Sequence, residues 1–506
     1  MTVEDVRLLS PELALAGVAL LVILLDLVVK RKGFLTAVSL VGLLVPISLS
    51  VLLWIDVDDE PGKQLVGIFA TLSVDHFALY FKFLVLLVVG LVVLASTDYV
   101  GKMERRQGEY FGLIMFSAVG MMLLAATRDL ISIYISLELT ALPLAALAAF
   151  LMTDRSSEAG MKFFIISAIS SALMLYGMAL VFGFTGSTYL TEIADSVSSL
   201  SGSAFGGEFV LLLGIVLIVA GFGFKISSVP FQMWVPDVYE GAPTPVTAYL
   251  SVASKAAGFA VLLRIFYIAF DTEALQLDWG ILFAVLAAAS MTVGNLVAIA
   301  QSNIKRLLGY STIAHAGYLL VGLAAVAARS TGGETIGPSS ILFYLGAYAV
   351  TNLAAFFAII AISNKVGSDQ IADFAGTSRR APFLAFALAL SLVALVGVPP
   401  TGIFIAKLYI FSAAVDSDLL WLAIVGVLNS VISAYYYLRV VRVMYLDPPP
   451  SEERVPSSYA FRVALGLATL AILAVGIVPG PLLKLAELSV VTLPNVVGGV
   501  TGAAVP

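Results

Sequence analysis

The chain has no cysteine and only two histidines, His76 and His315. Without cysteine it can form no disulfide, no thiolate zinc site and no cysteine-ligated iron–sulfur cluster. Two histidines also argue against a haem held by a histidine pair. We find neither a Gly-x-Gly-x-x-Gly motif nor a P-loop, so the sequence predicts no nucleotide site. We therefore expect this chain to bind no cofactor and no metal itself.

Charge is scarce as well. Only 12% of the 506 residues are charged and 60% are hydrophobic, whereas soluble domains carry about 25% charged residues. The mean hydropathy is +1.04, so lipid must surround much of the chain. About 20 apolar residues cross a bilayer as a helix, and the chain predicts an all-α membrane protein with about 14 transmembrane helices. The predicted spans lie at 11–29, 34–55, 75–97, 110–127, 130–151, 161–184, 209–228, 244–270, 280–300, 307–328, 339–363, 382–413, 419–445 and 459–480.

The loops between these spans alternate in charge. Basic loops include 30–32, 305–306 and 379–380, and acidic loops include 56–60 and 271–278. Basic loops face the cytoplasm, so an even number of spans predicts a multi-pass membrane protein with both termini outside. The first span has acidic residues before it and basic residues after it, which is the reverse of a signal peptide. We expect it to be retained.

Two of the predicted spans are broken. Pro230 and Pro236 interrupt the chain just after Lys225, and the sequence VGVPPTG interrupts the span 382–413. Proline cannot continue a helix, and a broken helix at membrane depth is tolerated only where it lines protein or a water-filled cavity. Each break lies in the fourth of five consecutive spans, 4–8 and 9–13.

A group of five helices has odd parity, so two consecutive groups must be inverted relative to each other, a recurring plan in transporters. The sequence therefore predicts two inverted five-helix repeats, each with one broken helix. The predicted domains are three N-terminal helices at 1–109, a first repeat at 110–271, a second repeat at 272–446, and a cytoplasmic linker with helix 14 at 447–506.

Five ionisable residues lie near the middle of predicted spans: Glu138, Lys225, Lys255, His315 and Lys407. A lysine at the centre of a membrane helix costs at least about 2.5–3.5 kcal/mol, so it is rarely there without a function. Each of these groups can take up and release a proton. A row of them at one depth, bridged by hydroxyls and trapped waters, predicts a lateral proton relay.

Each position also has a structural interpretation. Glu138 and Lys225 could form a fixed ion pair, and carbonyl groups freed at Pro399–Pro400 could neutralise Lys407. His315 by itself fits a buried structural histidine equally well.

Other conspicuous residues are expected to be structural. Lys82 and Arg264 lie closer to span ends, where we expect them to extend toward the membrane interface. His76 lies at the outer edge, and Trp234 and Tyr239 could be interfacial anchors.

Three segments carry a family resemblance: PFQMWVPDVYEGAPTPVTAYLSVASKAA, SNIKRLLGYSTIAHAGYLL and VGVPPTGIFIAKLYIF. They are similar to the antiporter-like membrane subunits of respiratory complex I, and within these to the subunit N family of bacterial NADH-quinone oxidoreductases. The resemblance covers nearly the whole chain and implies fourteen helices, inverted repeats and a proton channel. It carries the family's ionisable positions onto Glu138, Lys225, Lys255 and Lys407, in the fifth, seventh, eighth and twelfth helices.

Three features favour subunit N over its sister subunits. Lys407 stands where subunit M-like chains usually have glutamate, the chain stops soon after span fourteen instead of continuing into a lateral helix, and it contains the sequence DVYEGAPTPVTA. Gln232 is a departure, because many relatives have histidine there. A proton-carrying role at that position is therefore in doubt.

The resemblance implies a subunit of an enzyme that carries no redox centre itself, with NADH, FMN, iron–sulfur clusters and quinone in other subunits. Its implied partners are subunit M-like and K-like neighbours, the lateral helix of subunit L and the lipid bilayer, with no nucleic acid. Two alternatives remain open. One is a subunit of a multisubunit sodium/proton antiporter or membrane-bound hydrogenase. The other is a passive scaffold, which would leave four mid-membrane charges unexplained.

Overall fold

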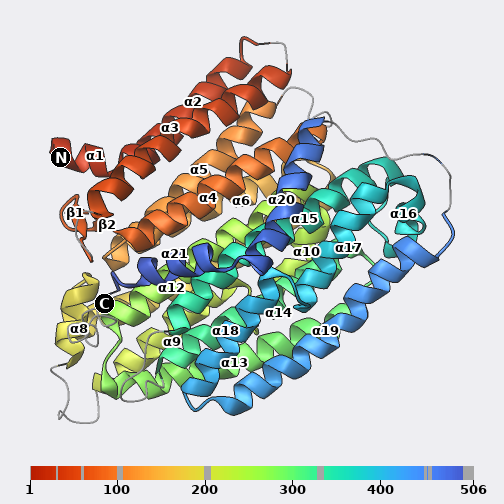
Figure 1. The fold of residues 1–506 in the computed structure, drawn as a ribbon. Helices are drawn as coiled ribbons and strands as arrows, with labels where there is room; N and C mark the ends of the chain where they lie inside the picture. Colours follow the sequence, from red (N-terminus) through yellow and green to blue (C-terminus); the bar gives the residue numbers. More distant parts are fainter. Residues whose placement is uncertain are drawn as a thin grey trace.

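Long apolar helices make up nearly all of the computed structural model (Figure 1). The structure describes residues 2–29, 32–58, 62–99, 106–198, 207–327, 336–449, 453 and 459–493. Within these ranges eleven helices are long and apolar enough to cross a membrane, and a bent pair of helices makes up to twelve. The prediction of an all-α membrane protein is confirmed.

The N-terminal part contains a helical hairpin and a short β-hairpin. Thr2 and Asp5 form a capping box at the first helix, in which each side chain bonds the other residue's backbone N–H. Asp75 caps α4 by accepting a hydrogen bond from the Ala78 N–H. The elements are α1 (Val3–Leu8), α2 (Ser10–Asp26), α3 (Lys32–Asp58), β1 (Leu65–Gly67), β2 (Leu72–Val74), α4 (His76–Ala95) and a 3₁₀ turn (Ser96–Asp98).

The next group of helices contains the first break. α9 ends at Ile226, and the chain resumes as the short helix α10 only at Trp234. Two π-helical segments, Leu250–Ser254 and Ile265–Ala269, flank α12. The elements are α5 (Gln107–Ala126), α6 (Leu130–Ala148), α7 (Asp154–Thr185), α8 (Leu190–Ser198), α9 (Gly207–Ile226), α10 (Trp234–Gly241), α11 (Thr244–Tyr249) and α12 (Lys255–Arg264).

The last group contains the second break, between α17 and α18. A further bend of 81° separates α20 from α21. The elements are α13 (Glu273–Ile299), α14 (Ile304–Ala327), α15 (Ile336–Val366), a 3₁₀ turn (Ile371–Phe374), α16 (Thr377–Arg380), α17 (Pro382–Val396), α18 (Gly402–Asp416), α19 (Leu420–Leu446), α20 (Tyr459–Ile477) and α21 (Gly480–Val490).

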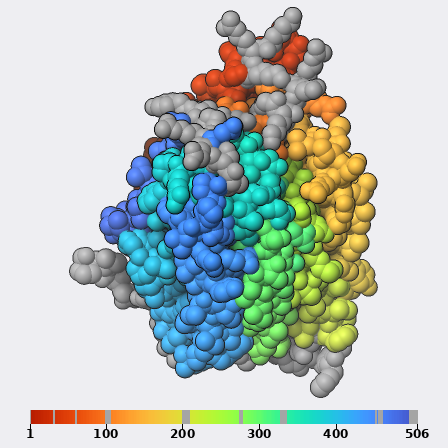
Figure 2. Space-filling model, turned by 90° about the vertical axis from the view of Figure 1, so that its right-hand side faces the viewer, coloured from red at the N-terminus to blue at the C-terminus, as the bar shows by residue number. Residues whose placement is uncertain are grey.

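The helices at the centre of the bundle differ from those at its edge. In the most apolar stretch of each segment, 94% of the residues are buried for 244–269 and also for α14, whereas only 28% are buried for α3. The outward faces of α3, α7 and α19 present large apolar side chains such as Leu52, Ile169 and Val431. Figure 2 shows α19 and α13 side by side on one such face. Lipid is the solvent that suits these faces, and α12 and α14 are the helices kept away from it.

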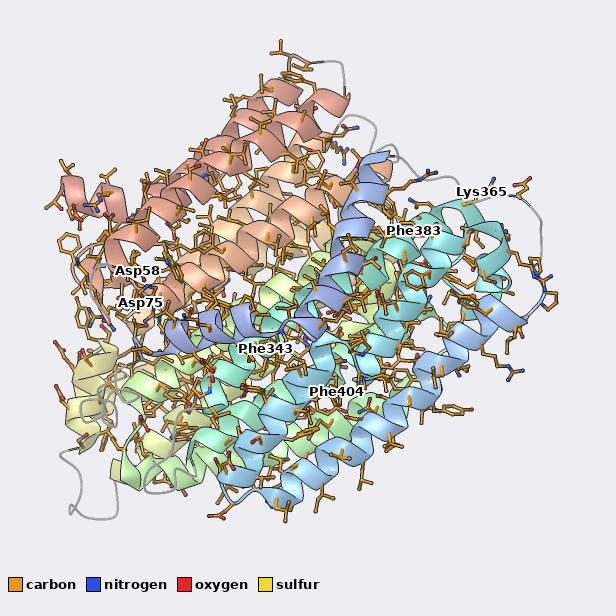
Figure 3. All side chains as sticks on the ribbon, viewed as in Figure 1. Asp58, Asp75, Phe343, Lys365, Phe383 and Phe404 are labelled. Atoms are coloured by element: carbon orange, nitrogen blue, oxygen red, sulfur yellow. The ribbon has the colours of Figure 1, made fainter. Side chains whose placement is uncertain are left out.

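The two ends of the bundle carry most of the charged side chains. Asp58 and Asp75 lie at one end and Lys365 at the other (Figure 3). Gln64 Nε2 donates to the Thr492 carbonyl over 2.7 Å, which places the end of α21 beside the β-hairpin, at the end where α1 begins. A chain that crosses the membrane an even number of times has its two ends on the same side. Several charges on which the predicted orientation depends, Lys30, Arg31, Asp59 and Glu60, lie outside the described residues.

Two of the fourteen predicted spans have shorter counterparts in the structure. Span 11–29 corresponds to α2 with 17 residues, and span 382–413 to α17 and α18 with 15 residues each. The count of fourteen, the inverted repeats and the domain boundaries remain predictions. The sequence did not lead us to expect the β-hairpin, α8 or α21.

Lys82 and Arg264 were expected to reach toward the membrane interface, but neither side chain extends outward from the bundle. Both are 1% exposed, and they form buried ion pairs with Glu12 at 2.8 Å and Asp75 at 2.7 Å. A buried charge needs a partner of opposite sign, and Glu12 and Asp75 supply it.

Trp234 and Tyr239 are not interfacial anchors either. Trp234 is 3% exposed and donates its indole N–H to the Phe224 carbonyl, and Tyr239 is 1% exposed. Both fill the space beside the break in α9. His76 is buried against Trp54, at 4.7 Å between ring centroids, as expected for a structural residue.

Candidate functional site

Lys225 lies on the last turn of α9, directly before the first break. The break begins at Ser227, which adopts a positive φ of 65°. The Gly223 and Phe224 carbonyls freed there accept hydrogen bonds from the Ser228 N–H at 2.8 Å and the Trp234 indole at 3.1 Å. Lys225 is 3% exposed, and its Nζ has no hydrogen-bond partner among the described residues. The carbonyl groups that the break frees therefore do not stabilise the Lys225 ammonium group.

Glu138 lies on α6 and is half-buried. It accepts a hydrogen bond from the Ser171 hydroxyl of α7, and α7 packs between α6 and α9. Glu138 and Lys225 therefore lie on two helices that both pack against α7. No hydrogen bond or ion pair joins these two described side chains, so they do not form the fixed ion pair considered above.

Lys255 begins α12, immediately after the π-helical segment. π-Bulges occur frequently at functional sites. Lys255 is 2% exposed, and its Nζ donates to the Thr312 carbonyl of α14. Gly258, one turn further on, faces Lys225. A Cβ at Gly258 would lie 3.6 Å from Lys225 Cγ. Because Gly258 has no side chain, α9 and α12, which carry Lys225 and Lys255, can pack closely at this point.

His315 lies at the centre of a group of tyrosines. Its Nδ1 is 2.6 Å from the Tyr344 hydroxyl, and its Nε2 is 3.5 Å from the Tyr437 hydroxyl. Tyr437 also bonds Ser311. His315 is 2% exposed. Both ring nitrogens therefore face hydroxyl groups, each of which can donate or accept a proton.

Lys407 lies on α18, just after the second break. Its Nζ donates to the Val396 carbonyl at 2.9 Å and to the Ser430 hydroxyl at 3.0 Å. Ser430 in turn donates to the Tyr318 hydroxyl over 3.2 Å, and Lys407 Nζ lies 4.3 Å from the centre of the Tyr318 ring. The Val396 carbonyl is one that the break frees, so this part of the structural interpretation of Lys407 is observed.

Hydroxyl groups fill the interval between Lys255 and Lys407. Thr312, which accepts from Lys255 through its carbonyl, bonds the Tyr348 hydroxyl over 3.0 Å through its side chain. The Tyr348 and Tyr318 rings both pack against the His315 ring, at 5.0 Å and 5.7 Å between centroids. Lys255, His315 and Lys407 thus belong to one buried polar cluster, whereas Glu138 and Lys225 form a second group beside it.

Comparison with known proteins identifies the family of this chain. A family model described as "NADH:quinone oxidoreductase/Mrp antiporter, TM" matches residues 127–433. The NADH-quinone oxidoreductase subunit N of Dehalococcoides mccartyi is 47% identical over 483 residues, which are 95% of this chain and 98% of that protein. The chain belongs to the subunit N family of NADH-quinone oxidoreductases.

Two solved structures have the same fold. A chain of respiratory complex I from Thermus thermophilus matches with a TM-score of 0.76 and 31% identity, over 94% of this chain and 99% of that one. A chain of an archaeal membrane-bound sulfane sulfur reductase matches with a TM-score of 0.86 and 26% identity, over 98% and 100%. The subunit N fold is therefore shared with respiratory complexes that differ in their redox chemistry.

An ion-pair network anchors α10, the short helix after the first break of this subunit N family member. Asp237 lies 2.8 Å from Lys162 Nζ on α7 and 2.7 Å from Arg306 on α14, and Glu240 lies 3.0 Å from Arg306. Burial favours the neutral acid, but hydrogen bonds from Lys162 and Arg306 outweigh it, so the pKa of Asp237 lies below its usual range. The network fixes α10 against its neighbours on either side.

The sequence predicted bridging hydroxyls only in general. Ser311, Thr312 and Tyr318 lie close to His315 in the chain. Tyr344 and Tyr348 on α15, and Ser430 and Tyr437 on α19, were not expected in the cluster. Their signal was present as polar side chains within apolar spans, but tyrosine is common in such spans and only the packing of α14, α15 and α19 brings these residues together.

Proposed function

We propose that this chain is a proton-translocating membrane subunit of a type I NADH:quinone oxidoreductase. It moves protons across a bacterial cell membrane while electrons pass from NADH to quinone in other subunits. The observation that carries the proposal is the buried cluster from Lys255 through His315 to Lys407, with Lys225 and Glu138 beside it. The subunit N names of its relatives support the enzyme assignment.

Each residue has a definite role in this proposal. When Glu138 approaches Lys225, its negative charge favours the protonated amine. When Glu138 withdraws or is neutralised, Lys225 releases its proton toward Lys255 across the contact of α9 with α12. The proton then passes the hydroxyls around His315 and reaches Lys407, which connects to the outside. Because Lys225 lacks a hydrogen-bond partner in the structure, no bond must break before it responds to Glu138.

The chain itself is proposed to bind no redox group. The energy arrives from neighbouring membrane subunits, which resemble subunits M and K, and from a lateral helix of subunit L. Both termini face the outside, as the alternating loop charges predict.

A subunit of a sodium/proton antiporter or of another respiratory complex is the second candidate function. The fold shared with the archaeal sulfane sulfur reductase supports it. The proteins that co-purify with the chain in mild detergent would distinguish the two, because only the first candidate requires NADH-oxidising subunits.

The decisive variant for the relay is Lys225→Arg. Arginine keeps the positive charge but is effectively never deprotonated in proteins. A structural lysine would tolerate the change, whereas a relay lysine would not, so we expect normal assembly and a loss of NADH-driven pumping of about tenfold or more. Pumping is measured in proteoliposomes with the purified complex, and assembly is checked on native gels.

Lys162→Arg is the matched control. Lys162 also forms ion pairs, with Glu158 and Asp237, but it lies outside the proposed relay, so this variant should pump at the wild-type rate. If Lys225→Arg pumps at that rate too, Lys225 is structural and the proton path lies elsewhere.

A further inference from the structure

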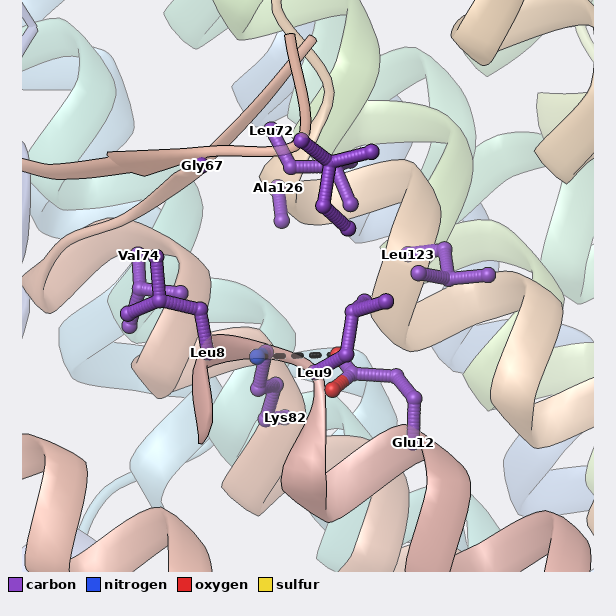
Figure 4. Close-up of a pocket in the computed structure, with 10 residues that line it drawn as sticks. Leu8, Leu9, Glu12, Gly67, Leu72, Val74, Lys82, Leu123 and Ala126 are labelled. Atoms are coloured by element: carbon purple, nitrogen blue, oxygen red, sulfur yellow. Dashed lines mark ion pairs between the residues drawn. The ribbon is translucent and has the colours of Figure 1, made fainter. Parts of the chain in front are cut away.

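A second buried ionisable site lies under the β-hairpin, away from the relay. Glu12 on α2 and Lys82 on α4 are 3% and 1% exposed and form an ion pair at 2.8 Å. Figure 4 shows both side chains reaching into one pocket. The Glu12 Oε2 atom has no hydrogen-bond partner among the described residues. A buried carboxylate oxygen without a partner is costly, so something absent from the protein's own side chains must satisfy it.

The pocket supplies the space for that partner. It has about 10 Å³ available to the centre of a water molecule, which is room for about one water. Its walls include Leu8, Leu123 and Ala126, which are apolar. Leu9, Ile68 and Leu72 also line it and are part-exposed, so this side of the pocket lies next to the surface of the chain at the β-hairpin end.

The hairpin that covers the pocket is held in an unusual conformation. Ile68, Phe69 and Ala70 all have positive φ, between 50° and 62°, a conformation that residues other than glycine rarely adopt. Asp5 holds it by accepting from the Ile68 N–H over 2.7 Å, and Tyr189 by donating to the Phe69 carbonyl over 3.0 Å. Such strain persists where the surroundings enforce it, often at functional sites.

Most of the neighbouring charges have partners of their own. On α1 and α3, Arg7 pairs with Glu4 and Asp56, and the N–H groups of Ile68 and Thr2 hold the pKa of Asp5 below its usual range. On α4, Asp75 pairs with Arg264, and His76 lies 3.4 Å from Asp58. From α5 the pocket meets only Leu123 and Ala126 among its described lining residues, and Arg128 follows beyond that helix. Lys82 is thus the charged partner that Glu12 meets in the pocket.

We propose that the Glu12–Lys82 pocket is a hydrated proton-binding site, open to the outer solution and separate from the relay. One water bonds Glu12 and exchanges protons with the outside under the hairpin. The proton binds at the Glu12 carboxylate, and the water carries it between that carboxylate and the solution outside. Proton uptake converts the ion pair into a neutral acid beside an ammonium group.

Infrared difference spectroscopy tests this proposal on the purified complex in lipid. We expect acidification to produce a carboxyl band that Glu12→Gln removes and that shifts in D₂O, because water reaches the site. Lys82→Met should make the same band appear at higher pH, since the charge that opposes protonation is gone. Glu12→Asp keeps an acid and should retain a band. It serves as the control that a band lost in Glu12→Gln reflects the missing carboxyl group rather than misfolding.

Pumping provides the second measurement. Because the site is separate from the relay, assembled Glu12→Gln should pump at close to the wild-type rate. Spectra of Glu12→Gln and wild type that coincide at every pH, or a Glu12 band that does not respond to D₂O, would overturn the proposal. Loss of pumping in fully assembled Glu12→Gln would place Glu12 in the relay and contradict the proposal that the two sites are separate. If instead the proposed relay is wrong, only the result for Lys225→Arg would change.

Discussion

Each of the two broken helices places a lysine beside an interruption at membrane depth, but only one of the two lysines is hydrogen-bonded to a carbonyl that the interruption frees. At the first break, the freed Gly223 and Phe224 carbonyls bond Ser228 and Trp234, and Lys225 is left without a partner. At the second break, the freed Val396 carbonyl accepts from Lys407 itself. The local sequence explains the difference. The first break consists of the donor-bearing segment SSVPFQM and is followed by Trp234, whereas the second contains Val398, Pro399 and Pro400 and offers no side-chain donor before Thr401.

This comparison separates two kinds of buried lysine. Lys225 Nζ has no hydrogen-bond partner among the described residues, so in the proposed relay its protonation depends on where the Glu138 carboxylate lies. Lys407 has two hydrogen bonds and the face of Tyr318, so its environment is fixed. In the proposed relay the first lysine is the one that responds, and the second is a receiver.

The largest effect is expected for Glu138→Gln. The variant keeps the shape of the side chain but removes the charge that favours a protonated Lys225, so pumping should fall by about tenfold or more. The measurement is NADH-driven proton uptake by proteoliposomes. Glu158→Gln, an exposed acid on α7, is the control and should pump normally. A Glu138→Gln complex that pumps at the wild-type rate would remove the basis for treating the two lysines differently.

A stability measurement compares the breaks directly. Lys407→Met leaves the Val396 carbonyl unbonded, which should lower stability by about 1–3 kcal/mol. Lys225→Met breaks no hydrogen bond and removes an uncompensated buried amine, so stability should be unchanged or raised. Thermal unfolding of the assembled complex, followed with both variants in parallel, gives the order. Equal destabilisation by the two changes would show that the breaks hold their lysines alike.

The smallest effect is expected at the anchor of α10, a helix with no counterpart directly after the second break. Asp237→Asn weakens the bonds to Lys162 and Arg306 and should cost up to about 1 kcal/mol at neutral pH, because these part-exposed pairs are screened by solvent. Since the folded-state pKa of Asp237 is depressed, the wild type has this stabilisation above the usual carboxyl range and loses it as pH falls through the lower, folded-state value.

Thermal unfolding at neutral and at acidic pH measures this difference. The gap between wild type and Asp237→Asn should narrow on acidification. A gap that stays constant with pH would mean that Asp237 stabilises α10 through packing rather than through its charge.

The sequence by itself determined the membrane environment, the helical class and both breaks, and it singled out the five ionisable residues as candidates. Apolar segments of bilayer length have no other stable solvent, prolines end helices wherever they fall, and lysines within apolar segments stand out without any knowledge of packing. The family resemblance rested on the same segments, and the comparisons confirm it.

Only the tertiary structure decided which groups meet. Periodicity along one helix cannot tell that α15 and α19 bring Tyr344 and Tyr437 to the two nitrogens of His315, because these contacts join residues far apart in sequence. For the same reason Lys82 and Arg264, which were expected at the interface, lie in buried ion pairs with Glu12 and Asp75. A charge in a membrane helix must be compensated, and sequence shows the charge, but the packing of distant helices selects its partner.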